Sequence, residues 1–237
     1  MATRGAAAGL RRAACIDLVA LRLNLSRMLQ ANDSFILDAR ADAYGHGAAA
    51  VIAVALAAGV STIRVSPGAA DIPGVQRSAL ITVPSKRALV AESAYGLDGE
   101  STPVMTLASE VISVKPTAAG AGVSYGYTYH TTDDTTLALV PLGFADGIPR
   151  LASNTARVFV AGAMHPLVGR VAMDQFVLDL GGDSAVTIGD EAVLFGDAAA
   201  GHPLVRDWAT WTRRTPLELT AGLGSRVQRV ITESTPA

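Results

Sequence analysis

The sequence predicts an α/β segment followed by a mainly antiparallel β domain. Residues 35–65 hold a short apolar run, an alanine-rich helical stretch and a second short apolar run, which is the β-α-β pattern of a parallel sheet. From about residue 104, short segments in which apolar and polar residues alternate are separated by turn residues, which predicts short strands. The 237 residues suffice for one large domain or two small ones.

At the N-terminus, we expect a flexible extension over residues 1–14 and then a helix. Arg11 and Arg12 resemble the start of a twin-arginine signal, but Asp17 and Arg22 interrupt the apolar stretch that such a signal needs. Asp17 stands immediately before the helical run, where it is placed to cap the first turn. Apolar residues recur there at helical spacing: Leu18, Leu21, Leu25, Met28 and Leu29.

The β-α-β unit follows. We expect a strand in "SFILDA", a helix in "GAAAVIAVALAAG" and a second strand in "STIRVS". The helix is apolar nearly all round, which predicts burial, and Gly59 is placed to end it. Parallel strands of this kind need cover on both faces.

Residues 66–103 are rich in Pro and Gly and show no sustained period. Five later segments predict strands of the β domain: "VMTLASEVISVKP", "TLALVPLGF", "ARVFVAG", "FVLDLGG" and "EAVLFGD". Thr215-Pro216-Leu217-Glu218 has the pattern of a capping box with proline at the first helical position, so a short helix is expected to start there.

The composition excludes several classes of protein. Hydrophobic residues make up 50% of the chain and charged residues 17%, which suits a sizeable core. A net charge of −2 without a basic block argues against nucleic acid as a partner. Cys15 is the only cysteine, so no disulfide or cysteine metal site forms within one chain, and no apolar run reaches the length of a membrane span. We expect a cytoplasmic protein that binds neither nucleic acid nor membrane.

"ILDARADAYGHGA", residues 36–48, is the candidate ligand site. A strand there leads through polar residues and a glycine turn into a helix, which is where α/β proteins build such sites. Two structural interpretations stand beside this one. Arg40 is placed to form an ion pair with Asp38 or Asp42, and Tyr44 to pack on the glycine turn.

These residues also carry a family resemblance. "IDLVALRLN" and "ADAYGHGA" resemble the opening of an alanine racemase. The second half is similar to that family, in the same order and spacing, at "GVSYGYTY", "PLGFADGIPR", "SNTARVFVAG", "GRVAMDQFVLDL", "IGDEAVLFG" and "GSRVQRV". The resemblance covers residues 14–66 and 94–230.

The resemblance implies a (β/α)8 barrel, a C-terminal β domain and pyridoxal 5′-phosphate (PLP) as cofactor. It also implies a homodimer that interconverts L- and D-alanine through a PLP carbanion, with the PLP lysine on one face of the substrate and a tyrosine of the other subunit on the opposite face. A whole barrel takes about 250 residues, and only about 85 residues precede the β domain here. We therefore expect a partial (β/α) barrel over residues 15–97 and an antiparallel β domain over residues 98–237.

Residue by residue, the resemblance places Arg40 at the PLP lysine, Tyr44 at a tyrosine near the cofactor phosphate and Tyr125 at the second catalytic base. It places Met173 at a backbone contact with the substrate carboxylate. Ser225 stands at a second phosphate tyrosine, and Leu89, two residues from Arg87, at the arginine facing the pyridine nitrogen. Two interpretations remain open: Tyr125 shares one strand face with Tyr127 and Tyr129, and Met173 packs in the core.

Arginine is a poor substitute for the lysine, because its guanidinium stays protonated and does not readily form an imine. It can still pair with a phosphate. The chain has only two lysines, Lys86 and Lys115. We expect an alanine racemase-like protein with impaired or absent turnover and doubtful PLP occupancy, assembled as a homodimer or larger oligomer. The alternatives are a non-catalytic binding protein built on the β domain and a decaying gene product.

Overall fold

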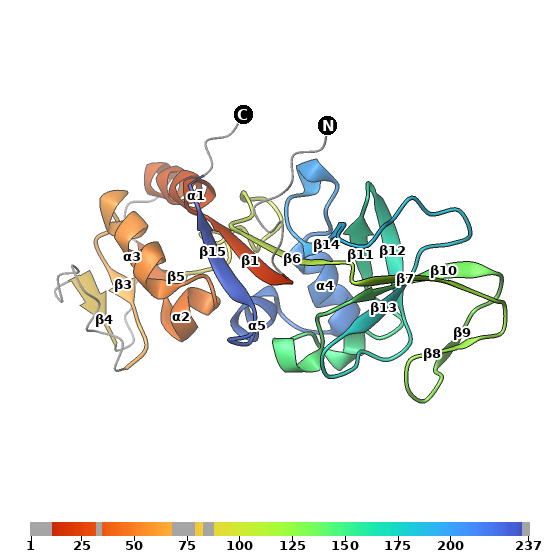
Figure 1. Cartoon of the computed structure of the whole chain (residues 1–237). Coiled ribbons are helices and arrows are strands. Elements are labelled where there is room, and N and C mark those ends of the chain that lie inside the picture. The colour runs from red at the N-terminus through yellow and green to blue at the C-terminus, as the bar shows by residue number, and fades with distance from the viewer. Residues whose placement is uncertain (1–10, 32–34, 68–78, 83–87, 234–237) are drawn as a thin grey trace. The chain divides into compact units, whose positions relative to one another are not determined.

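The computed structural model describes residues 11–31, 35–67, 79–82 and 88–233 (Figure 1). They form two compact units. The first, the β unit, joins Thr106–Thr215 to Leu223–Val230 and to the residues that precede Ile16. The second, the α/β unit, joins Ile16–Met105 to Pro216–Gly222 and to the residues that follow Val230. The predicted fold class, α/β plus mainly β, is confirmed.

The α/β unit contains a four-stranded sheet in the order β4-β3-β2-β5. All three strand pairs are parallel. The expected strands are β2 (Phe35–Asp38) and β3 (Ile63–Arg64). The other two, β4 (Leu80–Ile81) and β5 (Ala88–Val90), lie in the segment without a sequence period, because strands of two and three residues are too short to show one.

Two helices of this unit, α1 (Leu18–Ala31) and α3 (Ala48–Ala57), pack against each other. Asp17 Oδ1 accepts hydrogen bonds from the amides of Val19 and Ala20 at 2.8 and 3.1 Å, so the predicted N-cap is confirmed. Gly59, with φ of 97°, follows α3 as predicted. A short helix, α5 (Pro216–Ala221), begins at the predicted proline.

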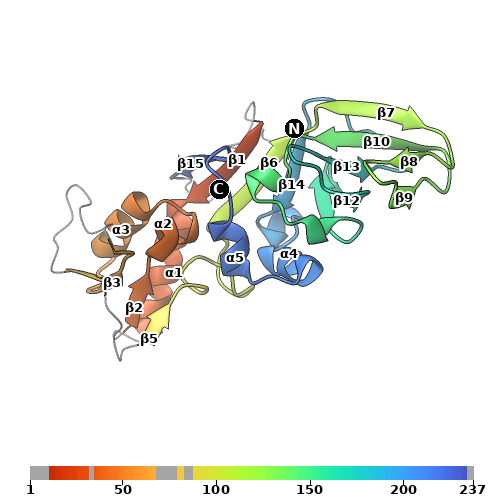
Figure 2. The same ribbon diagram turned by 90° about the horizontal axis from the view of Figure 1, so that it is seen from below.

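The β unit is dominated by a nine-stranded sheet in the order β15-β1-β6-β14-β11-β12-β13-β10-β7. Figure 2 shows β13, β10 and β7 side by side. The strands are β1 (Arg12–Asp17), β6 (Met105–Glu110), β7 (Ser113–Thr117), β10 (Thr135–Val140), β11 (Arg157–Val160), β12 (Ala163–Val168), β13 (Phe176–Asp179), β14 (Glu191–Phe195) and β15 (Gln228–Thr232). Six of the contacts between them are antiparallel, as predicted, including β10 with both neighbours.

Smaller elements complete this unit. β8 (Gly122–Val123) and β9 (Tyr129–His130) pair as an antiparallel hairpin. α4 (Val205–Thr212) is an α-helix, and η2 (Phe144–Asp146), η3 (Arg150–Ala152) and η4 (Ala198–Ala200) are single 3₁₀ turns. None of the helices in the described part of the chain has the length and hydropathy needed to cross a lipid bilayer.

The start of β1 corrects one prediction. Residues 12–14, assigned from sequence to a flexible extension, belong to this strand, and Ala13 and Ala14 are fully buried. Ala13 packs with Ala108 and Val193 in the core. Small side chains are needed where three strands approach closely, so an alanine-rich composition was misleading here.

Candidate functional site

The position of the expected PLP lysine holds an ion pair. Arg40 Nε and Nη2 donate to the two carboxylate oxygens of Asp38 at 2.9 and 2.6 Å. Tyr44 also donates its hydroxyl to Asp38 Oδ2 at 2.6 Å. Burial opposes ionisation of Asp38, yet the hydrogen bonds from Arg40 and Tyr44 outweigh it and hold the pKa of that carboxyl below its usual value. The ion-pair interpretation of Arg40 is therefore confirmed, with Asp38 as the partner.

The turn after Arg40 is left-handed. Ala41, Asp42 and Ala43 have φ of 51–55° and ψ of 46–48°, and Tyr44 has φ of 52°. This conformation costs about 1–2 kcal/mol for each residue that carries a Cβ. The turn brings the Tyr44 hydroxyl back onto the Asp38 carboxylate, so the strain falls on the segment that carries the candidate residues.

Neighbouring groups hold the strained turn in place. Ala41 N donates to Ser66 Oγ at 3.1 Å, and Asp42 Oδ1 accepts from Ala48 N, the first amide of α3, at 2.7 Å. Tyr95, fully buried, donates to the carbonyl of Asp38 at 2.8 Å and stacks on His46 with ring centroids 4.6 Å apart. Sequence reasoning missed Tyr95, although "SAYGLDG" placed an aromatic residue beside two glycines.

A shallow pocket of about 380 Å³ opens beside this turn. It is lined by Asp38, Tyr44, Leu89–Ser93 and Leu217. Leu89 is 40% exposed there, so an apolar side chain lies where the resemblance places an arginine. Arg87, the other candidate for that role, lies outside the described residues.

These residues do not fit a cofactor held through an amine. Arg40 offers no amine, and its guanidinium is held by a carboxylate that would repel a phosphate. Among the described residues the one lysine is Lys115, on β7 of the β unit. Lys86 lies outside the described residues. No group of three His, Cys, Asp or Glu side chains that would hold a metal ion occurs in the described part of the chain.

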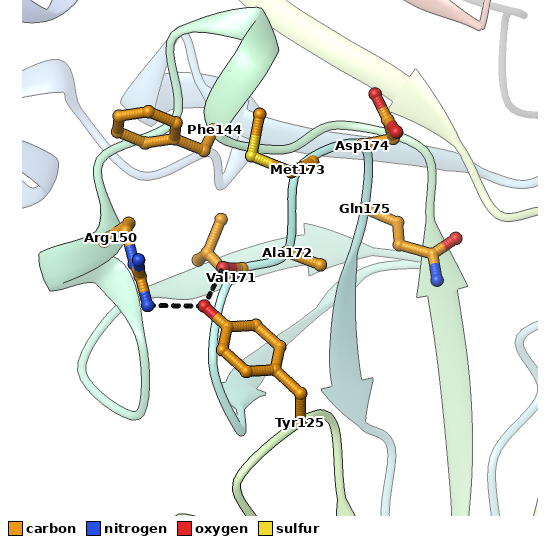
Figure 3. Close-up of a pocket in the computed structure, with 8 residues that line it drawn as sticks. All are labelled: Tyr125, Phe144, Arg150, Val171, Ala172, Met173, Asp174 and Gln175. Carbon is orange, nitrogen blue, oxygen red and sulfur yellow. Dashed lines mark hydrogen bonds between the residues drawn. The ribbon is translucent and has the colours of Figure 1, made fainter.

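A second pocket, of about 540 Å³, lies within the β unit (Figure 3). It is lined by Tyr125, Phe144, Arg150 and Val171–Gln175. Arg150 Nη2 donates to the Tyr125 hydroxyl at 2.5 Å, and that hydroxyl faces the carbonyl of Val171 at 3.4 Å. The structure thus brings together Tyr125 and Met173, two of the residues singled out in the sequence.

Tyr125 lies in the turn of the β8–β9 hairpin. Tyr125 and Tyr127 lie between β8 and β9, and Tyr127 has φ of 45°. They are 45% and 65% exposed, so the interpretation of these tyrosines as one strand face is wrong. Two hydrogen bonds join the hairpin to the rest of the β unit. Ser124 Oγ donates to Arg170 O, in the loop after β12, at 2.8 Å, and Tyr129 donates to Asp179 Oδ2, on β13, at 2.8 Å.

The loop that carries Met173 is fixed by its backbone. Its carbonyls at Ala172 and Met173 accept from the amides of Phe144 and Ala145, each at 2.9 Å. A Cβ on Gly143 would lie 2.5 Å from Met173 O, so only glycine allows this approach. Met173 is 59% exposed, and the prediction that it packs in the core is wrong.

A buried carboxylate ties these loops to the rest of the unit. Asp146, fully buried, accepts from the amide of Gly143 at 2.8 Å and lies 3.1 Å from the Nε atoms of both Arg12 and Arg226. Arg226 also donates to Asp174 at 2.6 Å, beside Met173. The sequence analysis did not predict that Asp146 is buried, although this residue lies within the apolar run "PLGFADGI".

The family model of known proteins that matches this chain matches it mainly over the β unit. The family model described as alanine racemase, C-terminal domain, matches residues 104–231, which are 128 of the 237 residues. Curated alanine racemases from Streptomyces coelicolor and Thermobifida fusca are 52% identical over 128 residues and 49% identical over 130 residues. These matches cover 54% and 55% of this chain but 32% and 34% of the relatives, so the matched region spans about a third of the relatives' length.

Solved structures resemble the chain over both units. An alanine racemase from Streptomyces coelicolor matches with a TM-score of 0.81 and 28% identity, over 97% of this chain and 100% of that chain. One from D-cycloserine-producing Streptomyces lavendulae matches with a TM-score of 0.82 and 25% identity, over 95% and 98%. One from Bartonella henselae with covalently bound pyridoxal phosphate, at 18% identity, shares the fold with a TM-score of 0.79 over 94% and 100%. By its family-model match and its close curated relatives, the chain belongs to the alanine racemase family.

Proposed function

We propose that this protein is an impaired alanine racemase that keeps the proton-transfer and amino-acid-binding half of the site and has lost the half that holds the cofactor. The observation that carries the proposal is the Tyr125 hydroxyl, which faces a pocket and receives a hydrogen bond from Arg150. Tyr125 and Met173 both lie in the region that the family model matches. Arg40 and Asp38, by contrast, do not fit PLP bound through an amine.

Each residue of the β unit pocket has a role in this proposal. The Tyr125 oxygen holds or releases the proton exchanged at the α-carbon, as a general acid or base. The backbone at Met173 orients the substrate carboxylate, and the side chains of Phe144 and Met173 exclude water from it. Tyr44 lines the other pocket, where the resemblance implies a contact with the cofactor phosphate. In this protein the Tyr44 hydroxyl donates to Asp38 instead.

A second chain completes the site in this proposal. Three large apolar side chains near the pocket, Phe144, Leu151 and Met173, are 51%, 53% and 59% exposed. Apolar exposure of this kind marks a contact surface. We propose a homodimer or larger oligomer, in the cytoplasm, in which the α/β unit of one copy covers the β unit of another. Sedimentation equilibrium tests it; a monomer at micromolar concentration would exclude the arrangement.

The activity test is exchange of the alanine α-hydrogen in D₂O with added PLP. We expect no exchange above the background of free PLP, because no amine stands at position 40. Tyr125→Phe is the matched control, since it removes only the hydroxyl from the pocket. Protein-dependent exchange in the unaltered chain that Tyr125→Phe abolishes would show the cofactor half to be intact.

A further inference from the structure

Tyr125 lies on a hairpin whose own strands are too short to hold it in place. β8 and β9 have two residues each and pair at two positions, one of which joins Val123 to Tyr129. A hairpin of two strands is at best marginally stable in water by itself. The position of the Tyr125 hydroxyl must therefore come from contacts between the hairpin and the rest of the β unit.

Two side-chain contacts hold the turn of this hairpin. Ser124 Oγ donates to Arg170 O at 2.8 Å, and Asn154 Nδ2 donates to Thr128 Oγ1 at 3.2 Å. Asn154 and Thr128 are both exposed, so water competes for the second bond and its net contribution is small. The turn is therefore fixed mainly at Ser124, immediately before Tyr125.

Tyr129 supplies a contact on the other strand of the hairpin. Its hydroxyl donates to Asp179 Oδ2, on β13, at 2.8 Å. Asp179 Oδ1 accepts from the hydroxyl of Thr135, on β10, and from the amide of Gly181 at 3.1 Å. These other donors hold the carboxylate in the body of the sheet, so Tyr129 bonds to a group that is already fixed.

The protonation states of Tyr129 and Asp179 favour the bond between them. Burial opposes ionisation of Asp179, yet its hydrogen bonds, led by the one from Thr135, hold the pKa of that carboxyl below its usual value. Burial and the bond to Asp179 raise the pKa of Tyr129 to about 12. Near neutral pH the phenol is therefore the donor and the carboxylate the acceptor, and such a charge-assisted bond is about twice as strong as a neutral one.

The two fixed points lie on either side of Tyr125. Ser124 precedes it, and Tyr129 follows it at the point where β9 pairs with β8. A turn held only at Ser124 can still tilt about that contact, whereas a second contact on the opposite strand restricts the tilt. The held position places the Tyr125 hydroxyl 2.5 Å from Arg150 Nη2 (Figure 3).

We propose that Tyr129, bonded to Asp179, is a positioning residue that determines where the Tyr125 hydroxyl lies against Arg150. Its importance for proton transfer rests on the proposed function, whereas the contact that it controls rests on the β unit alone. Tyr129 is not among the described residues that line the pocket, so it acts through the hairpin and not on a ligand.

The test is NMR of the whole protein with ¹⁵N-labelled arginine and ¹³C-labelled tyrosine. Tyr125→Phe gives the Arg150 Nε–Hε signal in the absence of the hydroxyl contact. We expect Tyr129→Phe to move that signal in the same direction and to move the Tyr125 Cζ signal with it. The ratio of held to released hairpin, read from the averaged signals, should fall about 10-fold or more, the scale of a lost hydrogen bond to a charged group.

Tyr127→Phe is the matched control, because it removes a hydroxyl from the same turn at a side chain that is 65% exposed. This variant should leave the Arg150 and Tyr125 signals in place. Unchanged Arg150 and Tyr125 signals in Tyr129→Phe would overturn the inference. So would shifts spread evenly over the β unit with a lower urea midpoint, which a merely structural role predicts. The measurement needs neither PLP nor turnover, so its failure is distinct from a failure of the proposed function, which alanine exchange tests.

Discussion

We propose that Asp38, as much as Arg40, disfavours a cofactor bound through an amine in this protein. In Arg40→Lys the new ammonium would lie beside a carboxylate that is 2% exposed and now accepts from Arg40 at 2.6 and 2.9 Å. Imine formation needs the neutral amine. A carboxylate within about 4–6 Å shifts a pKa by about 1–3 units toward the charged form, so the neutral fraction of the new lysine falls about 10-fold or more.

We therefore expect Arg40→Lys alone to capture little PLP and the double variant Asp38→Asn/Arg40→Lys to capture about 10-fold more. The Asp38→Asn change keeps the side-chain shape and an acceptor for Tyr44 while removing the charge. The assay is incubation with PLP, reduction with borohydride and peptide mapping, which separates residue 40 from Lys86 and Lys115. Asp42→Asn/Arg40→Lys is the matched control, because Asp42 contacts Ala48 N and not Arg40. Equal capture by the single and the Asp38 double variants would refute the role given to Asp38.

Three further predictions concern stability and the pocket loop. Gly143→Ala should displace residues 172–174, seen as NMR shifts confined to that loop, because the new Cβ would lie 2.5 Å from Met173 O. Unchanged loop signals would contradict this prediction. Asp146→Asn should lower the free energy of unfolding in urea titrations by about 1–3 kcal/mol, the scale of lost hydrogen bonds to a charged group, because it removes the buried carboxylate that lies between Arg12 and Arg226. Asp174→Asn, at an exposed pair, should change the free energy of unfolding little. The pKa of the Asp38 carboxyl is lowered in the folded protein, so its contribution to stability is present above the unfolded pKa of about 3.9 and is lost as the pH falls through the folded pKa. The urea midpoint of Asp38→Asn should therefore depend less on pH below about pH 4 than the midpoint of the unaltered protein. Parallel pH profiles of the two midpoints would contradict this prediction.

The sequence predicted those parts of the fold whose signals are local. Asp17 before an apolar helical run, Gly59 after one and Pro216 at a helix start each depend on a few neighbouring residues, and all three were confirmed. The sequence did not predict β4 and β5, because strands of two and three residues are too short to show a periodic pattern. The sequence did not predict that residues 12–14 belong to a strand, because small side chains suit both a flexible terminus and a tightly packed strand.

The candidate sites depend on contacts between distant residues, and sequence reasoning reached them only in part. A left-handed turn is expected at glycine, so Ala41, Asp42 and Ala43 gave no sign of one. The spacing of the tyrosines suggested a strand, but Gly126, with φ of 73°, makes the segment a turn. Arg150 was not singled out, because its contact with Tyr125 joins residues 25 apart in the sequence.

The most direct test of the central claim is complementation between chains. The partner chain is the alanine racemase from Streptomyces coelicolor with phenylalanine in place of the tyrosine that the family resemblance aligns with Tyr125. By that resemblance it would lack its own proton-transfer hydroxyl and keep a cofactor lysine. Refolding it together with an excess of this protein should restore racemase activity if this protein supplies the tyrosine half of a shared site. The Tyr125→Phe variant of this protein should restore none. No activity with the unaltered chain, in mixtures where sedimentation shows the mixed assembly, would contradict the account.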